Sequence, residues 1–299
     1  MDNRAFISYR RDLSAFVARA VFQDLRANGI DVFMDVESID AGQFDTVILN
    51  QIAARPYFLV IFTPGSLERC TNPLDWLLRE ITQAVALQRI IIPLVSPNFS
   101  FDETERFLPG NVAAEVQRAN AVNIPHDYFQ AAMDRLRTRF LKPVDLPSQA
   151  IKDEERRVVE GKTQRLTAAS PVTQQQLSAQ NHLERALIRR DEDLDGKIAE
   201  YTKALRKDPH SMTAYEQRGD AYARKGDSAK AMADYSEAIT IAEQGAESSW
   251  SWGFYTVEAR DGPEAAADYY HHADRLREHA ARISAKVAHL QEAWRASKS

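Results

Sequence analysis

The stretch YFLVIF, residues 57–62, is a continuous apolar run with no polar residue in alternation. A strand of a parallel sheet has this pattern because helices cover both of its faces. Amphipathic stretches separate it from other short apolar runs. Those runs are AFISY (5–9), IDVFM (30–34), RIIIPLV (89–95) and AVNI (121–124). The alternation predicts an open, doubly wound α/β fold, a flavodoxin-like arrangement with a parallel five-stranded sheet.

A helix is expected in CTNPLDWLLREITQA, residues 70–84, with Thr71 or Asn72 as its cap. Its apolar side chains form one stripe, which predicts the face that packs on the core. They are Leu74, Leu77, Leu78, Ile81 and Val85. Trp76 and Glu80 are four residues apart, so they lie one above the other on the opposite face, which is expected to be solvated. An aromatic ring beside a carboxylate at such a position is a candidate site.

The 299 residues are enough for two domains that each bury a core. We expect an α/β domain at 1–142, a linker at 143–176 that is rich in proline, charge and glutamine, and a helical domain at 177–299. The linker could be partly helical.

Charge and apolar patterning exclude several classes of protein. The 43 acidic residues outnumber the 38 lysines and arginines, and neither predicted domain has the basic excess that nucleic-acid binding requires. No signal peptide or membrane-spanning run is found, so we expect a cytoplasmic protein without a membrane partner.

Few residues could support metal or cofactor chemistry. The single cysteine, Cys70, allows no internal disulfide and is interpreted as a small apolar filler. His271 and His272 have no further ligands at suitable spacing, so no metal site is predicted. No G-x-G-x-x-G or Walker motif is present, and no bound cofactor is expected.

The C-terminal part contains an internal repeat. IAEYTKALRKDP and AMADYSEAITIA align at a shift of 34 residues, which pairs Tyr201 with Tyr235 and Ala204 with Ala238. This period, with glycine at 219 and 226, closely resembles the tetratricopeptide repeat. Two to three repeats and a long helix at 263–297 are expected. Such arrays bind peptides or copies of themselves, although a purely structural dimerising tail remains the alternative.

The motifs of the first 142 residues occur together in one family. FISYRRD, VFMDVESIDAGQF, SLERC, DWLLREI, IIPLV and IPHDYFQAAMDRL appear in the order and at the spacing of the Toll/interleukin-1 receptor (TIR) domain. The segment resembles the branch of that family whose members cleave NAD, which includes many prokaryotic defence proteins. Other members are adaptors that only assemble, so the family alone does not decide catalysis.

The resemblance implies a role for each residue of the candidate site. Glu80 would be the catalytic carboxylate, and Trp76 would stack on nicotinamide. Arg10 or Arg11 would hold the pyrophosphate or ribose, and Tyr9 would shape the pocket. The remaining residues belong to loops: Asp35 and Phe44 to the mobile loop beside the pocket, and His126 and Tyr128 to a segment that reaches the pocket of a neighbouring protomer.

Structural interpretations remain open for the same residues. Arg10 and Arg11 could pair with surface carboxylates, for which Glu37, Asp40 and Asp45 are the candidates. Trp76 and Glu80 could form a protein-contact face. Asp127 could cap a helix beside His126 in a surface loop.

The sequence therefore predicts an NAD+ glycohydrolase that needs assembly for activity and acts in prokaryotic defence or signalling. It would release nicotinamide and either ADP-ribose or a cyclic isomer. Its partners would be NAD+, other TIR copies, and a protein or peptide at the repeats. A non-catalytic scaffold is the main alternative, and a TIR domain that acts on another nucleotide or on nucleic acid is a weaker one.

Overall fold

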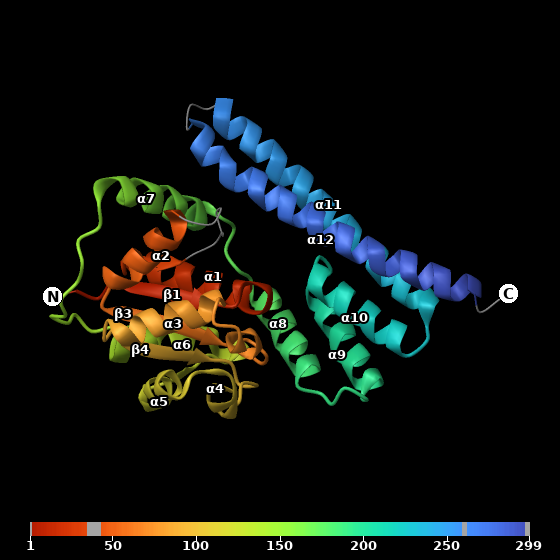
Figure 1. Ribbon diagram of the computed structural model, residues 1–299, viewed down its shortest axis with the longest axis horizontal. Coiled ribbons are helices and arrows are strands. Elements are labelled where there is room, and N and C mark those ends of the chain that lie inside the picture. The colour runs from red at the N-terminus through yellow and green to blue at the C-terminus, as the bar shows by residue number, and fades with distance from the viewer. Residues whose placement is uncertain (1, 35–42, 259–261, 297–299) are drawn as a thin grey trace. The chain divides into compact units, whose positions relative to one another are not determined.

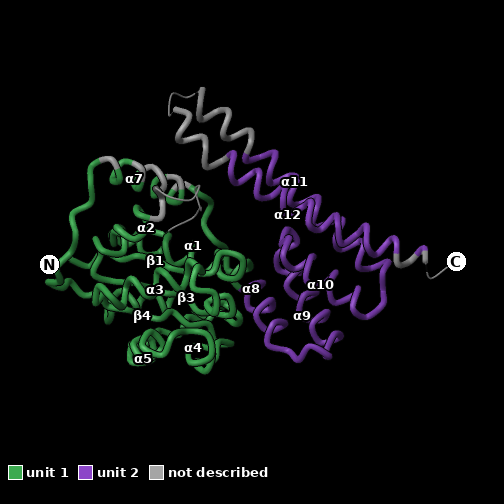
Figure 2. Tube along the Cα trace, in the orientation of Figure 1, with its two compact units in different colours: residues 1–177 green, residues 178–299 purple. Residues whose placement is uncertain are grey.

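The computed structural model describes residues 2–34, 43–258 and 262–296. Their contacts divide into two compact units, residues 1–177 and 178–299 (Figure 2). The predicted helical domain begins at residue 177, next to this boundary, but the expected linker at 143–176 falls inside the first unit.

The first unit is built on a five-stranded parallel sheet in the order β2-β1-β3-β4-β5 (Figure 1). This confirms the predicted α/β fold. The strands are β1 (Ala5–Tyr9), β2 (Val32–Met34), β3 (Tyr57–Phe62), β4 (Ile90–Val95) and β5 (Val122–Asn123). The helices are α1 (Arg11–Ala27), α2 (Gln43–Ala53), α3 (Trp76–Ala86), α4 (Asp102–Phe107), α5 (Gly110–Arg118), α6 (Phe129–Arg135) and α7 (Asp153–Ala168). Shorter helical turns are η1 (Glu68–Thr71), η2 (His126–Tyr128) and η3 (Leu136–Phe140).

Strand β3 shows why its sequence is continuously apolar. Tyr57, Leu59 and Ile61 enter one core, with α1 and α6, whereas Phe58, Val60 and Phe62 enter the other, with α2, α3 and α5. Successive side chains of a strand point to opposite faces, so both faces of the sheet are buried under helices.

The segment after residue 142 packs on this domain instead of forming a free linker. Val159 of α7 joins one core and Leu166 joins the other. The Gln149 backbone amide also donates to the Ala53 carbonyl at 3.1 Å. Apolar side chains spaced along α7 are buried in the two cores, so this part of the expected linker packs on the domain.

The second unit is helical, as predicted. Its helices are α8 (Gln174–Leu187), which begins just before the boundary, α9 (Leu194–Lys207), α10 (Met212–Arg224), α11 (Ser228–Glu258) and α12 (Gly262–Ala296). The third repeat expected near residues 250–273 falls on the end of α11 and the start of α12, which are 31 and 35 residues long. Two long helices therefore replace a further short helical pair.

The residues paired by the 34-residue shift have matching environments. Tyr201 and Tyr235 are both buried, as are Ala204 and Ala238. Gly219 lies against the Tyr235 ring, where an added Cβ would be only 2.7 Å from a ring carbon. The sequence period therefore coincides with a period in burial.

Charged side chains connect α10 to α11 and α12 within this unit. Arg218 forms an ion pair with Asp234 at 2.7 Å. Glu216 is in contact with His279 at 2.8 Å and with Lys286 at 2.9 Å. The hydrogen bond from His279 acts against burial and, with Lys286, lowers the pKa of Glu216 to about 2.

Candidate functional site

The candidate site lies where β1 ends and α3 begins. Ser8 is buried on the same face of β1 as Phe6, which is the face that α3 covers. Helix α3 starts at Trp76, and Asp75 is its cap, with a side chain that accepts from the Leu78 amide at 3.2 Å. The topology therefore brings β1 and α3 together at the carboxyl edge of the sheet.

The predicted cap of this helix was wrong. Asn72 instead accepts from the Leu74 amide at 3.0 Å, and η1 occupies the preceding residues. An Asx turn therefore uses the Asn72 side chain, and the first turn of α3 is left to Asp75. Leu74, expected on the core stripe, precedes the helix and is 79% exposed.

Glu80 is buried, with 6% exposure, although its helical position predicted a solvated face. The Ser8 hydroxyl donates to Glu80 Oε2 at 2.5 Å. Helical periodicity identifies the apolar stripe of α3 but does not show that β1 covers part of the polar side. The result is a carboxylate held by a buried hydroxyl at a strand end.

Trp76 lies one helical turn before Glu80 and is partly buried. The guanidinium of Arg79 lies over its ring, 4.1 Å from the centroid, which is within the range of a cation–π interaction. The helix therefore places an aromatic ring and the Glu80 carboxylate on neighbouring turns.

Arg10 points into the protein, and its exposure is 6%. It donates to both carboxylate oxygens of Asp75, at 2.7 and 2.9 Å, and its Nε donates to the Ser66 carbonyl at 2.9 Å. The guanidinium of Arg10 is thus engaged in a buried ion pair, and its expected contact with NAD pyrophosphate or ribose stays a prediction. Glu37, Asp40 and the side chain of Asp45, the candidates for a surface pair, lie outside the described part of the chain. Arg10 and Asp75 are 65 residues apart, so no local pattern pairs them.

This ion pair changes the titration of its neighbours. Burial acts to raise the pKa of Asp75, but the hydrogen bonds and charge of Arg10 outweigh it and hold that pKa below its usual value. Cys70 lies beside both groups, 3.6 Å from Arg10 Nη2. Burial, helped by the Asp75 charge, raises the pKa of the Cys70 thiol to about 12, so the thiol stays protonated. This fits the predicted filler role.

The structure describes two of the four other predicted pocket residues in full. Tyr9 and Arg11 are partly buried at the end of β1 and the start of α1. Asp35 lies outside the described residues. Phe44 belongs to the first turn of α2, but its side chain lies outside the described part.

The two residues expected to reach a neighbouring protomer differ in exposure. Tyr128 is 72% exposed, whereas His126 is 2% exposed. His126 was expected at the surface under both of its interpretations, and burial in η2 corrects that expectation. Tyr128 remains available to a partner.

The loop after β3 completes the edge of the sheet around this site. Gly65 has φ of +76°, a conformation that glycine adopts without strain. Its amide donates to Glu103 at 3.2 Å, and burial raises the pKa of Glu103. Our sequence reasoning did not single out Ser8, Asp75 or Glu103. Ser8 and Asp75 stand inside the motifs FISYRRD and DWLLREI, which is the signal that could have found them.

Other kinds of site are not found in the described part of the chain. Its His, Cys, Asp and Glu side chains include no group of three placed to hold a metal ion. None of its helices combines the length and apolarity needed to span a membrane.

Comparison with known proteins defines the class to which this fold and site belong. The family model for the TIR domain matches residues 5–137, so the first unit contains a TIR domain. The chain is similar to "NAD(+) hydrolase sarm1" of Drosophila melanogaster, with 39% identity over 140 residues. It is also similar to "NAD(+) hydrolase tir-1" of Caenorhabditis elegans, with 34% identity over 139 residues, and to "NAD(+) hydrolase SARM1" of Danio rerio, with 29% over 147 residues.

These matches cover only part of each protein. They span 46% of this chain for the fly and nematode proteins and 48% for the fish protein. They span 10%, 14% and 20% of those relatives, respectively. The chain therefore matches a fifth or less of the length of each of these relatives.

Proposed function

We propose that the TIR domain hydrolyses NAD+ at the bond between nicotinamide and ribose, with Glu80 as the catalytic carboxylate. The observation that carries the proposal is the burial of Glu80 against Ser8 at the carboxyl edge of the sheet, where open α/β sheets bind ligands. Similarity to three proteins named NAD(+) hydrolases supports the choice of substrate.

The chemistry requires little more than one well-placed negative charge. The nicotinamide nitrogen of NAD+ is cationic, so the C1′–N bond breaks with its electron pair going to that nitrogen, and nicotinamide leaves as a neutral base. No general acid is needed, in contrast to ordinary glycoside hydrolysis. The positive charge moves to the ribosyl oxocarbenium ion, which the Glu80 carboxylate stabilises in a water-poor site.

The remaining groups orient the substrate and complete the reaction. Ser8 fixes one carboxylate oxygen of Glu80, and the Trp76 ring offers a flat surface for nicotinamide. Water then attacks C1′ and releases a proton, which gives ADP-ribose. If an adenine nitrogen attacks first, a cyclic isomer forms. Arg11 and Tyr9 are the proposed phosphate and pocket contacts, because Arg10 is engaged with Asp75.

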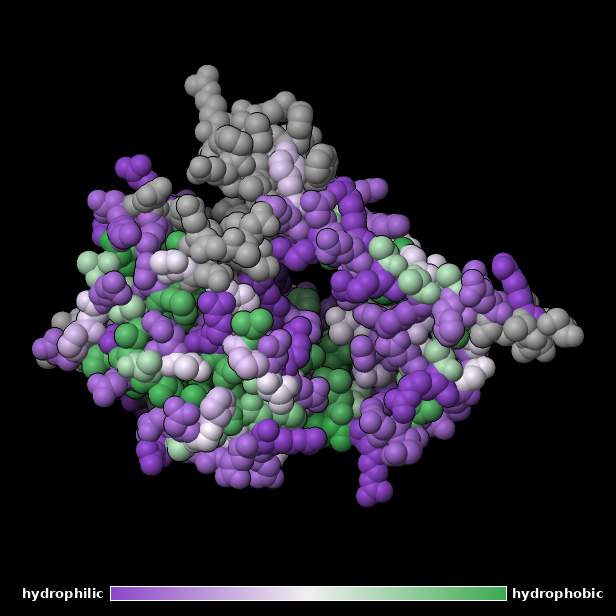
Figure 3. Space-filling model, viewed as in Figure 1, coloured by the Kyte–Doolittle hydropathy of each residue, from purple (hydrophilic) through white to green (hydrophobic). Residues whose placement is uncertain are grey.

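We further propose that activity depends on assembly of TIR domains. The face in Figure 3 shows hydrophobic residues dispersed among hydrophilic ones on the first unit, so the candidates for a contact are individual exposed side chains and not a continuous patch. Leu74 and Tyr128, at 79% and 72% exposure, are the strongest candidates for self-association.

The second unit would control that assembly as a tetratricopeptide-like array with a protein or peptide partner. The shared burial of Tyr201 and Tyr235, and the contact of Gly219 with Tyr235, support the repeat assignment. By gathering partners, the array would raise the local concentration of the TIR domain. We also propose that the protein acts in the cytoplasm, in prokaryotic defence or signalling.

The test is NAD+ consumption by the full chain at several protein concentrations, with products separated by chromatography. Glu80→Gln should reduce turnover by roughly 10²–10³-fold, because it removes one preorganised charge. Glu115→Gln on the exposed side of α5 is the matched control and should leave turnover unchanged. Turnover that survives in Glu80→Gln contradicts the assignment. No turnover at any concentration favours a non-catalytic scaffold.

A further inference from the structure

A cavity lies in the first unit, at the edge of the sheet opposite the candidate site. Its volume is about 580 Å³. Arg4, Asp31 and Arg55 line it, and each comes just before β1, β2 or β3 in the sequence. The strands are parallel, so these residues share the amino edge, about 15 Å of strand away from the carboxyl edge. The cavity is therefore separate from Glu80.

The segment after the TIR domain forms the other wall of this cavity. Residues 148–151 and helix α7 contribute nine of its lining residues, among them Arg156 and Glu160. This wall is tied to the domain by hydrogen bonds from Arg89 to the Pro147 carbonyl, at 2.9 Å, and from Asn50 to Glu155, at 3.0 Å. The expected linker thus forms one wall of a cavity large enough for a small molecule.

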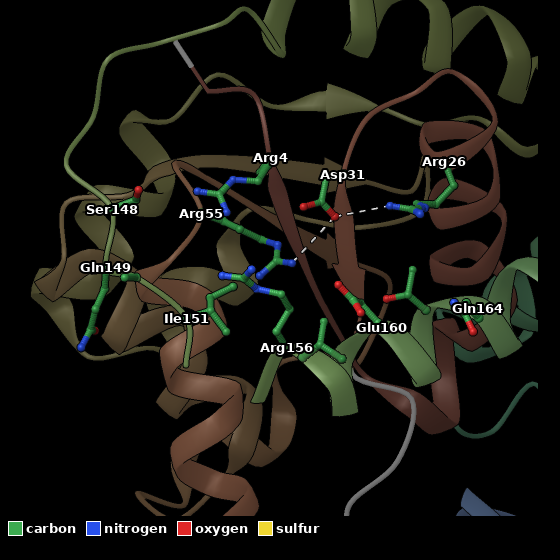
Figure 4. A pocket seen from close by; sticks show the side chains of 13 residues that line it. Arg4, Arg26, Asp31, Arg55, Ser148, Gln149, Ile151, Arg156, Glu160 and Gln164 are labelled. Atoms are coloured by element: carbon green, nitrogen blue, oxygen red, sulfur yellow. Dashed lines mark hydrogen bonds and ion pairs between the residues drawn. The ribbon is translucent and has the colours of Figure 1, made fainter. Parts of the chain in front are cut away.

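Among the described residues that line the cavity, arginines outnumber carboxylates. Arginines come from both walls, as Figure 4 shows: Arg4, Arg26 and Arg55 from the TIR domain and Arg156 from α7. Against them stand two carboxylates, Asp31 and Glu160. Asp31 is shared between Arg26, at 3.4 Å, and Arg55, at 3.9 Å, and the dashed lines in Figure 4 mark both pairs. Arg4 also pairs with Asp2, at 2.8 Å, and Arg156 with Asp153, at 3.8 Å, whereas Arg26 and Arg55 share the single carboxylate of Asp31.

Arg55 is the residue that most requires an additional partner. Its exposure is 2%, and its Nε has no hydrogen-bond partner among the described residues. Its Nη1 donates to the Gln51 side chain, and its nearest carboxylate, Asp31, lies beyond hydrogen-bond distance. Burial, opposed only in part by Asp31, lowers the pKa of Arg55 to about 10. A buried cation with an incomplete set of partners is costly, and a bound anion would remove that cost.

We propose that this cavity is a second ligand site, which binds a small organic molecule through its phosphate group. Arginine forks match phosphate oxygens in geometry and charge, and a phosphate would give Arg26 and Arg55 a further anionic partner besides the Asp31 carboxylate that they share. The volume falls within the roughly 300–1,000 Å³ of small-molecule pockets, so it accommodates more than a free phosphate ion. The ligand would bridge the TIR domain and α7 and hold that helix in place. This inference does not depend on NAD+ cleavage.

The experiment is calorimetric titration of the full chain, in low-salt buffer, with ribose 5-phosphate and with inorganic phosphate. Ribose 5-phosphate should bind more tightly. Arg156→Ala, on the exposed surface of α7, should weaken its binding at least tenfold, the effect of losing roughly one charge-assisted hydrogen bond. Glu160→Gln should strengthen binding, because it removes a repulsive carboxylate. Arg118→Ala, an exposed arginine on α5, is the matched control and should have no effect.

Several results would overturn the proposal. These are no binding of either probe at millimolar concentration, tighter binding of inorganic phosphate than of ribose 5-phosphate, or equal losses in Arg156→Ala and Arg118→Ala. Loss of binding in Arg11→Ala but not in Arg156→Ala would place the phosphate at the TIR candidate site instead. The cavity is supported if Arg156→Ala weakens binding, Glu160→Gln strengthens it and Arg118→Ala leaves it unchanged. General attraction to surface charge would not distinguish Arg156 from Arg118.

Discussion

Replacing Arg10 by methionine should destabilise the TIR domain and not merely weaken substrate binding. The Arg10 and Asp75 side chains are only 7% and 9% exposed, and two short hydrogen bonds join them. Arg10→Met leaves the Asp75 charge buried without its partner, which costs about 3–5 kcal/mol. For a domain of this size, that corresponds to a decrease in Tm of roughly 6–20 °C.

Two further variants separate the ion pair from other effects. The double variant Arg10→Met/Asp75→Asn leaves no unpaired charge, so its loss should be smaller than the sum of the two single losses. Arg69→Met, which removes an exposed ion pair with Asp12, is the matched control and should cost less than about 1 kcal/mol.

The assay is scanning calorimetry of the full chain, together with hydrogen–deuterium exchange of peptides from β1 and α3. The pKa of Asp75 is lower in the folded state, so the stability that it contributes is present above its ordinary value of 3.8 and is lost as the pH falls below it. The reasoning is refuted if Arg10→Met remains within about 1 kcal/mol of the wild type while the KM for NAD+ rises. That result would instead assign Arg10 to substrate binding.

Three shorter predictions follow from the same structure. Ser8→Ala should reduce NAD+ turnover about tenfold or more, because Glu80 loses a buried donor, and an unchanged rate would exclude a positioning role. Gly219→Ala should lower the Tm of the helical unit, because its Cβ would stand 2.7 Å from the Tyr235 ring; an unchanged melting curve would contradict the close contact. In the wild type, the lowered pKa of Glu216 stabilises the helical unit, and this stability is lost as the pH falls from 4.5 to about 2. Glu216→Gln should make the stability of the helical unit, followed by circular dichroism, less dependent on pH over that range.

The sequence was sufficient for the architecture of the first unit because local patterns encode it. Runs such as YFLVIF are buried on both faces, and their order along the chain sets the parallel sheet. The same reasoning failed where two distant segments meet. The burial of Glu80 depends on Ser8, 72 residues away, and the position of Arg10 depends on Asp75, 65 residues away. Periodicity describes one helix at a time and does not show what covers its polar side.

The expected linker illustrates a second reason for error. Prolines, charges and glutamines gave residues 143–176 the composition of a flexible segment. Two of its apolar side chains, Val159 and Leu166, are nevertheless buried in the cores of the TIR domain. Composition averages over a segment, whereas packing depends on where its apolar residues fall along the helix.

The position of Cys70 gives the protein an internal reporter of transient opening. The chain has one cysteine, its thiol is buried beside Arg10 and Asp75, and its pKa of about 12 keeps it in the unreactive protonated form. An alkylating reagent can therefore modify the folded chain only when this part of the domain opens. The modification rate then measures how often the region around Cys70, Arg10 and Asp75 opens, at one known position and without any added label. A substrate that closes the site should slow that rate in proportion to its occupancy.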